Sequence, residues 1–138
     1  MRLVALVAGF CWGLVAFGLG ARAYGAGIWG GVAASPFIGL AVAALLQPRF
    51  EASTGRGRWL LALAGLYFGA TLFALAVGAT DALTGSASRN AGEVVLQAVA
   101  GTWWGITLTG FLLFLWPLAY LTHLVLEWIS DRPIPGRT

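Results

Sequence analysis

Four long runs of apolar residues, separated by more polar stretches, dominate the chain. The runs cover residues 3–20, 26–46, 59–80 and 102–126. Each is close to the roughly 20 residues that an α-helix needs to cross the hydrocarbon core of a bilayer. This pattern predicts an all-α membrane protein, a bundle of four transmembrane helices in a single membrane domain over residues 1–138.

The stretches between the runs predict connections of unequal length. Residues 47–58 are polar and rich in Pro and Gly, a composition typical of an exposed loop. Residues 81–101 predict a longer insertion, in which a Ser/Thr/Gly-rich loop precedes either a short interfacial helix or the start of the last span. Residues 127–138 predict a polar tail. Pro36 and Pro117 lie inside the second and fourth runs, where each predicts a kink or interruption.

The second and fourth runs share a pattern of residues, and so do the first and third. Gly27–Leu40 aligns with Gly101–Phe114, and the segment that begins at Gly9 aligns with the one that begins at Gly65. The identical pairs in the first alignment are Gly27/Gly101, Trp29/Trp103, Gly31/Gly105 and Phe37/Phe111, and Ser35/Thr109 is a similar pair. We therefore expect two parallel repeats of one helical hairpin, residues 3–46 and 59–126.

The first run also has the features of a signal peptide, with a basic start, an apolar stretch and small residues around Arg22. Cleavage of residues 1–23 is one interpretation. The match between this run and an internal span favours retention.

Composition supports a membrane protein. Hydrophobic residues make up 59% of the chain and charged residues 9%, so that too few polar side chains exist to coat a water-soluble globule. The lipid bilayer is the expected partner, together with other membrane chains or a second copy of this one. The net charge is +3, but the basic residues are scattered, which excludes a nucleic-acid-binding patch.

The basic residues predict the orientation. With four spans, one side of the membrane holds most of them, namely Arg2, Arg49, Arg56, Arg58, Arg132 and Arg137, and the other side holds Arg22 and Arg89. The positive-inside rule then places both termini in the cytoplasm. All basic residues are Arg, and Ala, Gly and Leu are abundant, a composition typical of a GC-rich bacterial genome. We expect a multi-pass protein of the inner membrane.

Small residues recur at helical spacing in the runs, where they let neighbouring helices approach closely. The predicted helix-packing residues are Gly9, Gly13, Gly27, Gly31, Ser35, Gly39, Gly65, Gly69, Gly101 and Gly105.

Few side chains in the spans carry chemistry. No ionisable residue lies in the middle of any run, which argues against proton-coupled and ion-coupled mechanisms. Ser35, Thr107 and Thr109 are candidates for a polar or pore lining, although hydroxyls in membrane helices usually bond a carbonyl of their own helix. Cys11 is the single cysteine, predicted to be an inert packing thiol, so the sequence predicts no metal site.

The single histidine, His123, has three interpretations. With Tyr120 and Glu127 it forms one face of a helix, where a small polar cluster could bind a ligand head group. The pair Ala119 and His123 resembles the small-x-x-x-His arrangement of bacterial light-harvesting helices, which implies a pigment or haem ligand. The third interpretation is an interfacial side chain that reaches toward water beside Glu127. We expect no cofactor.

Two functions fit these features. The first is a non-enzymatic membrane protein that acts through helix packing, as a small subunit, scaffold or assembly partner of an inner-membrane complex. The alternative is a small oligomeric channel or facilitator for a neutral or lipid-like solute, in which the hydroxyl groups would line a path. Trp12 and Trp116 lie deep in their runs, where they pack in the core or stack on a pigment, quinone or lipid chain. An intramembrane enzyme has the least support, since no acid–base pair is present.

Overall fold

The computed structural model describes residues 2–85 and 90–131, and these ranges contain helices and no strand. The elements are α1 (Arg2–Tyr24), the short 3-10 helix η1 (Gly25–Gly27), α2 (Ile28–Ala52), α3 (Arg56–Thr84), α4 (Ala91–Leu108) and α5 (Leu112–Ser130). Four segments are long and apolar enough to cross a membrane, namely α1, η1 with α2, α3 and α5. The predicted all-helical fold with four apolar spans is confirmed, and the described residues form five α-helices where the sequence predicted four transmembrane helices.

Some sequence predictions fall outside the described residues. These are residues 86–89 of the predicted insertion, the predicted tail beyond residue 131, and the side chains of Arg22, Arg89, Arg132 and Arg137.

The first hairpin is built on close backbone contact between α1 and α2. A Cβ atom on Gly9 would overlap the backbone of Gly39, and one on Gly13 would overlap the side chain of Ser35. The turn between the two helices uses Gly25 at φ +53°, a conformation that glycine adopts without a steric penalty. Pro36 lies inside α2 without interrupting it.

The connection between α2 and α3 is much shorter than the predicted loop 47–58. Helix α2 continues to Ala52 and α3 begins at Arg56, so that three residues separate them. The polar composition of this stretch predicted exposure, yet Gln47 and Phe50 are buried almost completely. Tertiary packing against α5 has overridden the local signals.

The second hairpin differs from the prediction at two places. Helix α3 continues past residue 80 to Thr84, and much of the predicted insertion 81–101 forms the first part of α4, which begins at the N-cap Asn90. The predicted span 102–126 is not one helix. It is divided between α4 and α5 by residues 109–111, where Gly110 has φ +75°, whereas Pro117 lies inside α5.

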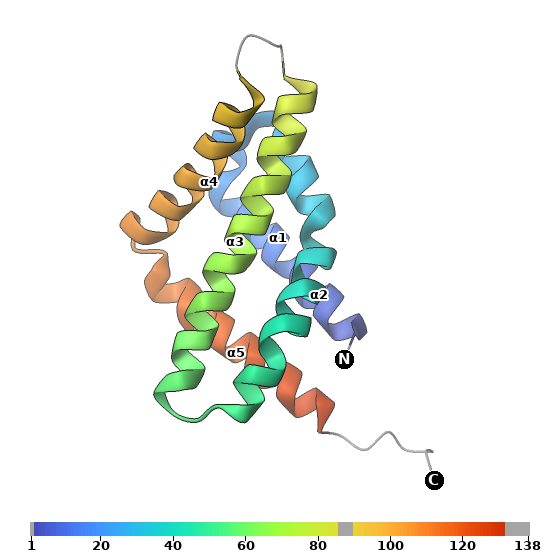
Figure 1. Ribbon diagram of the computed structural model, residues 1–138, viewed down its shortest axis with the longest axis vertical. Coiled ribbons are helices and arrows are strands. Elements are labelled where there is room, and N and C mark those ends of the chain that lie inside the picture. Colours follow the sequence, from blue (N-terminus) through green and yellow to red (C-terminus); the bar gives the residue numbers. More distant parts are fainter. Residues whose placement is uncertain (1, 86–89, 132–138) are drawn as a thin grey trace.

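Figure 1 shows how these elements are arranged. Helix α3 runs along most of the length of the molecule, α4 lies beside its upper half, and α5 crosses its lower half obliquely. The start of α1, the turn between α2 and α3, and the end of α5 all lie in the lower half of this view. Helices α4 and α5 together therefore complete a fourth passage from one end of the bundle to the other.

The buried core consists of three small clusters. The first joins α3 to α5 through Ala62, Leu66, Leu115 and Ala119. The second joins α1, α2 and α5 through Ala5, Ala43 and Leu126. The third joins α2 to α3 through Ile28, Phe73 and Val77. Cys11 is not part of the core. It is exposed on α1, so its predicted role as a packing thiol was wrong. Hydrophobic character alone does not distinguish a side chain that faces lipid from one that faces another helix.

Candidate functional site

A central cavity of about 290 Å³ lies between the helices, and all five contribute to its wall. The wall is mainly apolar: it includes Trp12, Val42, Leu66 and Leu115 and many glycine and alanine residues. Close-packed protein interiors leave few spaces much larger than a water molecule. A cavity of this size in so small a bundle is therefore a candidate binding site for an apolar molecule.

Two pairs of the predicted packing glycines differ in what surrounds them. A Cβ atom on Gly27 would lie 2.8 Å from the carbonyl oxygen of Val77, and one on Gly31 would lie 2.5 Å from the Val77 side chain, so α2 and α3 pack closely there. A Cβ atom on Gly101 or Gly105 would meet nothing within 4 Å. These two glycines of α4 line the cavity and leave it wide.

The remaining two predicted packing glycines lie on α3 and also line the cavity. A Cβ atom on Gly69 would meet Val42 at 3.6 Å, an ordinary contact. A Cβ atom on Gly65 would lie 3.3 Å from Nε2 of His123, which is a tight approach. The sequence predicted Gly65 and His123 for different roles, and the structure brings them together.

The three hydroxyl residues predicted as a polar lining lie in different surroundings. Ser35 and Thr109 lie in the cavity wall, but Ser35 donates a hydrogen bond to the Gly31 carbonyl at 2.9 Å and Thr109 donates to the Gly105 carbonyl. Thr107 is not a wall residue: it bonds Tyr67 at 2.8 Å on an exposed face of α3 and α4. The Ser35 and Thr109 hydroxyl groups therefore have no proton left to donate to a molecule in the cavity.

Where α1 and α4 meet in the cavity wall, the side chains of Tyr24 and Thr102 share a hydrogen bond. Thr102 donates its own proton to the Ala98 carbonyl at 2.8 Å. Tyr24 is therefore the donor in the bond between the two side chains.

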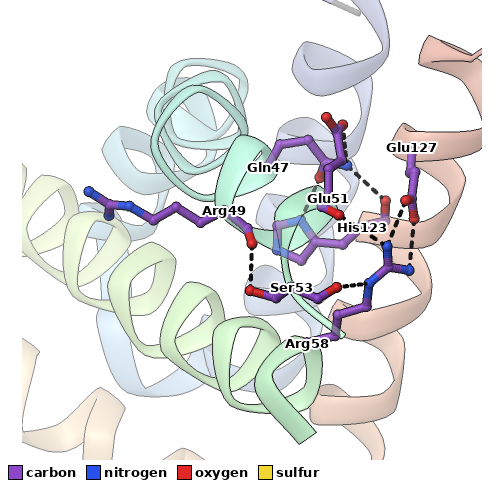
Figure 2. Close-up of polar contacts among 7 residues, drawn as sticks. All are labelled: Gln47, Arg49, Glu51, Ser53, Arg58, His123 and Glu127. Carbon is purple, nitrogen blue, oxygen red and sulfur yellow. Dashed lines mark hydrogen bonds and ion pairs between the residues drawn. The ribbon is translucent and has the colours of Figure 1, made fainter. Parts of the chain in front are cut away.

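His123 also lies in the cavity wall and is 4% exposed. It does not reach toward water beside Glu127, so that interpretation was wrong. Its ring stacks on Phe50, with centroids 4.8 Å apart, and its Nδ1 lies 2.7 Å from Oε1 of Gln47 (Figure 2). The extension of α2 beyond residue 46, which supplies both partners, is what encloses the histidine.

The orientation of Gln47 decides the tautomer of His123. Its Nε2 donates to a carboxylate oxygen of Glu51 at 3.1 Å and to the carbonyl oxygen of His123 at 3.2 Å. Both partners are acceptors, so the amide nitrogen must face them and the amide oxygen must face the imidazole. Nδ1 therefore carries the proton of the neutral ring, and Nε2 carries a lone pair.

An ion pair fixes the ends of the helices around this histidine. Arg58 donates two hydrogen bonds to the carboxylate of Glu127, at 2.7 and 3.1 Å, and a third to the carbonyl of Ser53 at 2.8 Å (Figure 2). Its guanidinium also lies 5.0 Å from the centre of the Phe50 ring. These contacts hold the turn between α2 and α3 against α5, and with it the partners of His123.

Aromatic side chains continue this packing outside the ion pair. Tyr120 stacks on Trp59 at 4.2 Å, and Trp116 donates a hydrogen bond to the Trp59 carbonyl at 2.7 Å. Tyr120, His123 and Glu127 of the predicted face thus each contact side chains of α2 or α3. Among the described residues, no three His, Cys, Asp or Glu side chains form a group that could hold a metal ion.

Sequence reasoning missed Gln47, Phe50 and Arg58 as residues of the site. Their spacing contains a signal, since Gln47, Phe50 and Glu51 stand at i, i+3 and i+4 and would share one helix face if α2 continued. Pro48 and the polar composition of residues 47–58 instead predicted a loop, so this helical spacing was not used. Comparison with protein-family models, curated proteins and solved structures finds no match for this chain, so the site is interpreted from its own geometry.

Proposed function

We propose that this chain is a non-enzymatic, multi-pass membrane protein whose central cavity binds and passes a lipid-like, electrically neutral solute. The observation that carries the proposal is the 290 Å³ cavity with its mainly apolar wall. Its volume is roughly twice that of an engineered apolar cavity of about 150 Å³ that binds benzene. An occupant with on the order of a dozen non-hydrogen atoms fits this space.

A second hollow supports access from the side of the bundle. It has a volume of about 230 Å³ and is lined by residues of α1 and α5. Ala8, Thr122 and Leu126 line both this hollow and the central cavity. A solute dissolved in lipid would reach the cavity between α1 and α5 without crossing water.

The break between α4 and α5 also fits a binding role. Irregular backbone at membrane depth is tolerated where it is buried in protein or lines a cavity. Thr109 and Phe111, on either side of Gly110, both lie in the cavity wall. Broken helices at binding sites are a recurring feature of membrane transporters.

The test fills the cavity from an open position. We expect Gly105→Leu to expel the solute, because the new side chain enters free space at the wall. Gly18→Leu is the matched control. A Cβ atom at position 18 also meets nothing within 4 Å, but this residue lies outside the wall. Mass spectrometry of an organic extract of the purified proteins measures the bound molecule. Equal amounts in Gly105→Leu and wild type would overturn the proposal.

The orientation proposed for this protein follows from the distribution of Arg and places both termini in the cytoplasm of a bacterial inner membrane. With two spans in each repeat, the two hairpins would have the same orientation and be related by a pseudo-twofold axis along the membrane normal. In Figure 1 the start of α1, the end of α5 and the α2–α3 turn lie in the same half of the molecule, which supports placing both termini on one side of the membrane.

A role as subunit or assembly partner is the second candidate. It is favoured by α4, which has no buried residue and exposes Leu96, Trp103, Trp104 and Leu108. The internally bonded hydroxyl groups of Ser35 and Thr109 also fit this role, since no water-lined path is needed. Purification in a mild detergent tests it: a subunit would be recovered with other membrane chains, and a self-contained carrier alone or as a homo-oligomer.

A further inference from the structure

We infer that the solute of the proposed cavity is an amphiphile that ends in a hydroxyl group, and that Nε2 of His123 accepts its hydrogen bond. This inference rests on the proposed function and names the chemical class of its ligand. Long-chain alcohols and phenols with an apolar tail belong to this class. The tail would occupy the apolar space toward α4, with the hydroxyl group at the α5 end.

The first argument is the unpaired lone pair. Gln47 holds the proton of the neutral imidazole on Nδ1, because its amide nitrogen is committed to Glu51 and to the His123 carbonyl. Nε2 is therefore an acceptor, and it has no hydrogen-bond partner in the part of the chain that the structure describes. No fully buried side-chain nitrogen or oxygen there lacks a partner, so Nε2 keeps some accessible surface. An occupant that covered this nitrogen without donating a proton would leave a buried polar atom unsatisfied.

The second argument is the space in front of Nε2. Gly65 and His123 both line the cavity, and a Cβ atom on Gly65 would stand 3.3 Å from Nε2. The same Cβ atom would lie 3.1 Å from the Leu46 side chain, so the space beside Nε2 is narrow, and a glycine at position 65 leaves it unfilled. An alanine at this position would put a methyl group there.

The third argument is the state of the hydroxyl groups in the wall. The protons of Ser35, Thr102 and Thr122 are all donated to carbonyl groups of their own helices. These hydroxyl groups therefore have no proton free for a ligand that only accepts hydrogen bonds, such as an ether or ester. The hydroxyl oxygens can still accept a hydrogen bond, but Nε2 of His123 is an acceptor that no group in the described part of the chain bonds at all.

The experiment uses the full-length chain in lipid nanodiscs and a photoreactive probe, 1-dodecanol with a diazirine in the middle of its chain. Mass spectrometry of peptides maps the labelled residues. Three competitors of similar length are then compared: 1-dodecanol donates a hydrogen bond, dodecyl methyl ether only accepts, and dodecane does neither. Each is added at the same mole fraction of the bilayer.

We expect labelling of the cavity wall on α1 and α3, and we expect 1-dodecanol to compete about tenfold more strongly than the ether, or better. Gly65→Ala should bring this ratio close to one, whereas Gly69→Ala, whose methyl group meets Val42 at an ordinary 3.6 Å, should preserve it. His123→Phe, which retains the stack on Phe50 but has no acceptor, should also abolish the preference.

The outcomes separate the two proposals. Wall labelling with equal competition by alcohol and ether would overturn the inference about the hydroxyl group and leave the apolar cavity as the binding site. Labelling confined to lipid-facing residues would overturn both. A preference for the alcohol that survives in His123→Phe would also overturn the inference, since another group would then be the acceptor.

Discussion

The segments Gly27–Leu40 and Gly101–Phe114 have the same spacing of glycine and aromatic residues but pack differently in the bundle. The first runs from η1 into an unbroken α2, and its glycines pack closely, Gly27 and Gly31 against α3 and Gly39 against α1. The second is divided between α4 and α5, and its glycines face open space. Small residues permit close packing, but they produce it only where a neighbouring helix fills the space they leave.

The matched positions explain where the second segment breaks. Pro36 of the first segment corresponds to Gly110 of the second. The proline fixes φ near −65°, which a helix can accept, whereas the glycine takes φ +75°, which ends one helix and redirects the chain into the next. Thr109 and Phe111, which flank this glycine, lie in the cavity wall.

The largest expected effect is a difference in stability between two pairs of matched glycine variants. Gly27→Ala and Gly31→Ala should each lower the unfolding free energy by about 1–3 kcal/mol, because the added methyl group would overlap α3. Gly101→Ala and Gly105→Ala should leave it unchanged or raise it by up to about 1 kcal/mol through helix propensity. Titration with a denaturing detergent measures these values. Equal losses in both pairs would contradict the comparison.

An intermediate effect is expected at the break. Gly110→Ala should lower the unfolding free energy by about 1–2 kcal/mol, because an L-residue is strained at the left-handed φ of this position. Pro36→Ala is the matched control and should lose no stability, since it restores an N–H group to the interior of α2. The same detergent titration applies. A stable Gly110→Ala protein would show that α4 and α5 can join without strain.

The smallest effect is expected for the matched hydroxyl groups. Ser35→Ala and Thr109→Ala should each change the unfolding free energy by less than about 1 kcal/mol, because both hydroxyls bond a carbonyl of their own helix. Neither should reduce the amount of bound solute in an organic extract. A marked loss of solute in either variant would indicate that the hydroxyl group contacts it directly.

The sequence predicted the architecture well and the site poorly. Apolar runs of sufficient length predicted four spans, because the bilayer imposes a minimum length that is visible in any single chain. His123 was recognised as unusual, but its burial was missed. The stretch from Gln47 to Arg58 has the composition of a loop, and only contact with α5 makes it a helix end that encloses the histidine.

The sequence alone determined that this protein is helical, apolar and free of charge in the middle of its spans. Those properties depend on residues that lie next to one another along the chain. The tertiary structure decided which glycines pack and which line the cavity, and it decided that His123 lies in the cavity wall beside Gly65. Both depend on residues brought together from distant helices, such as Gly65 beside His123 and Gln47 across from α5, and no local pattern contains that information.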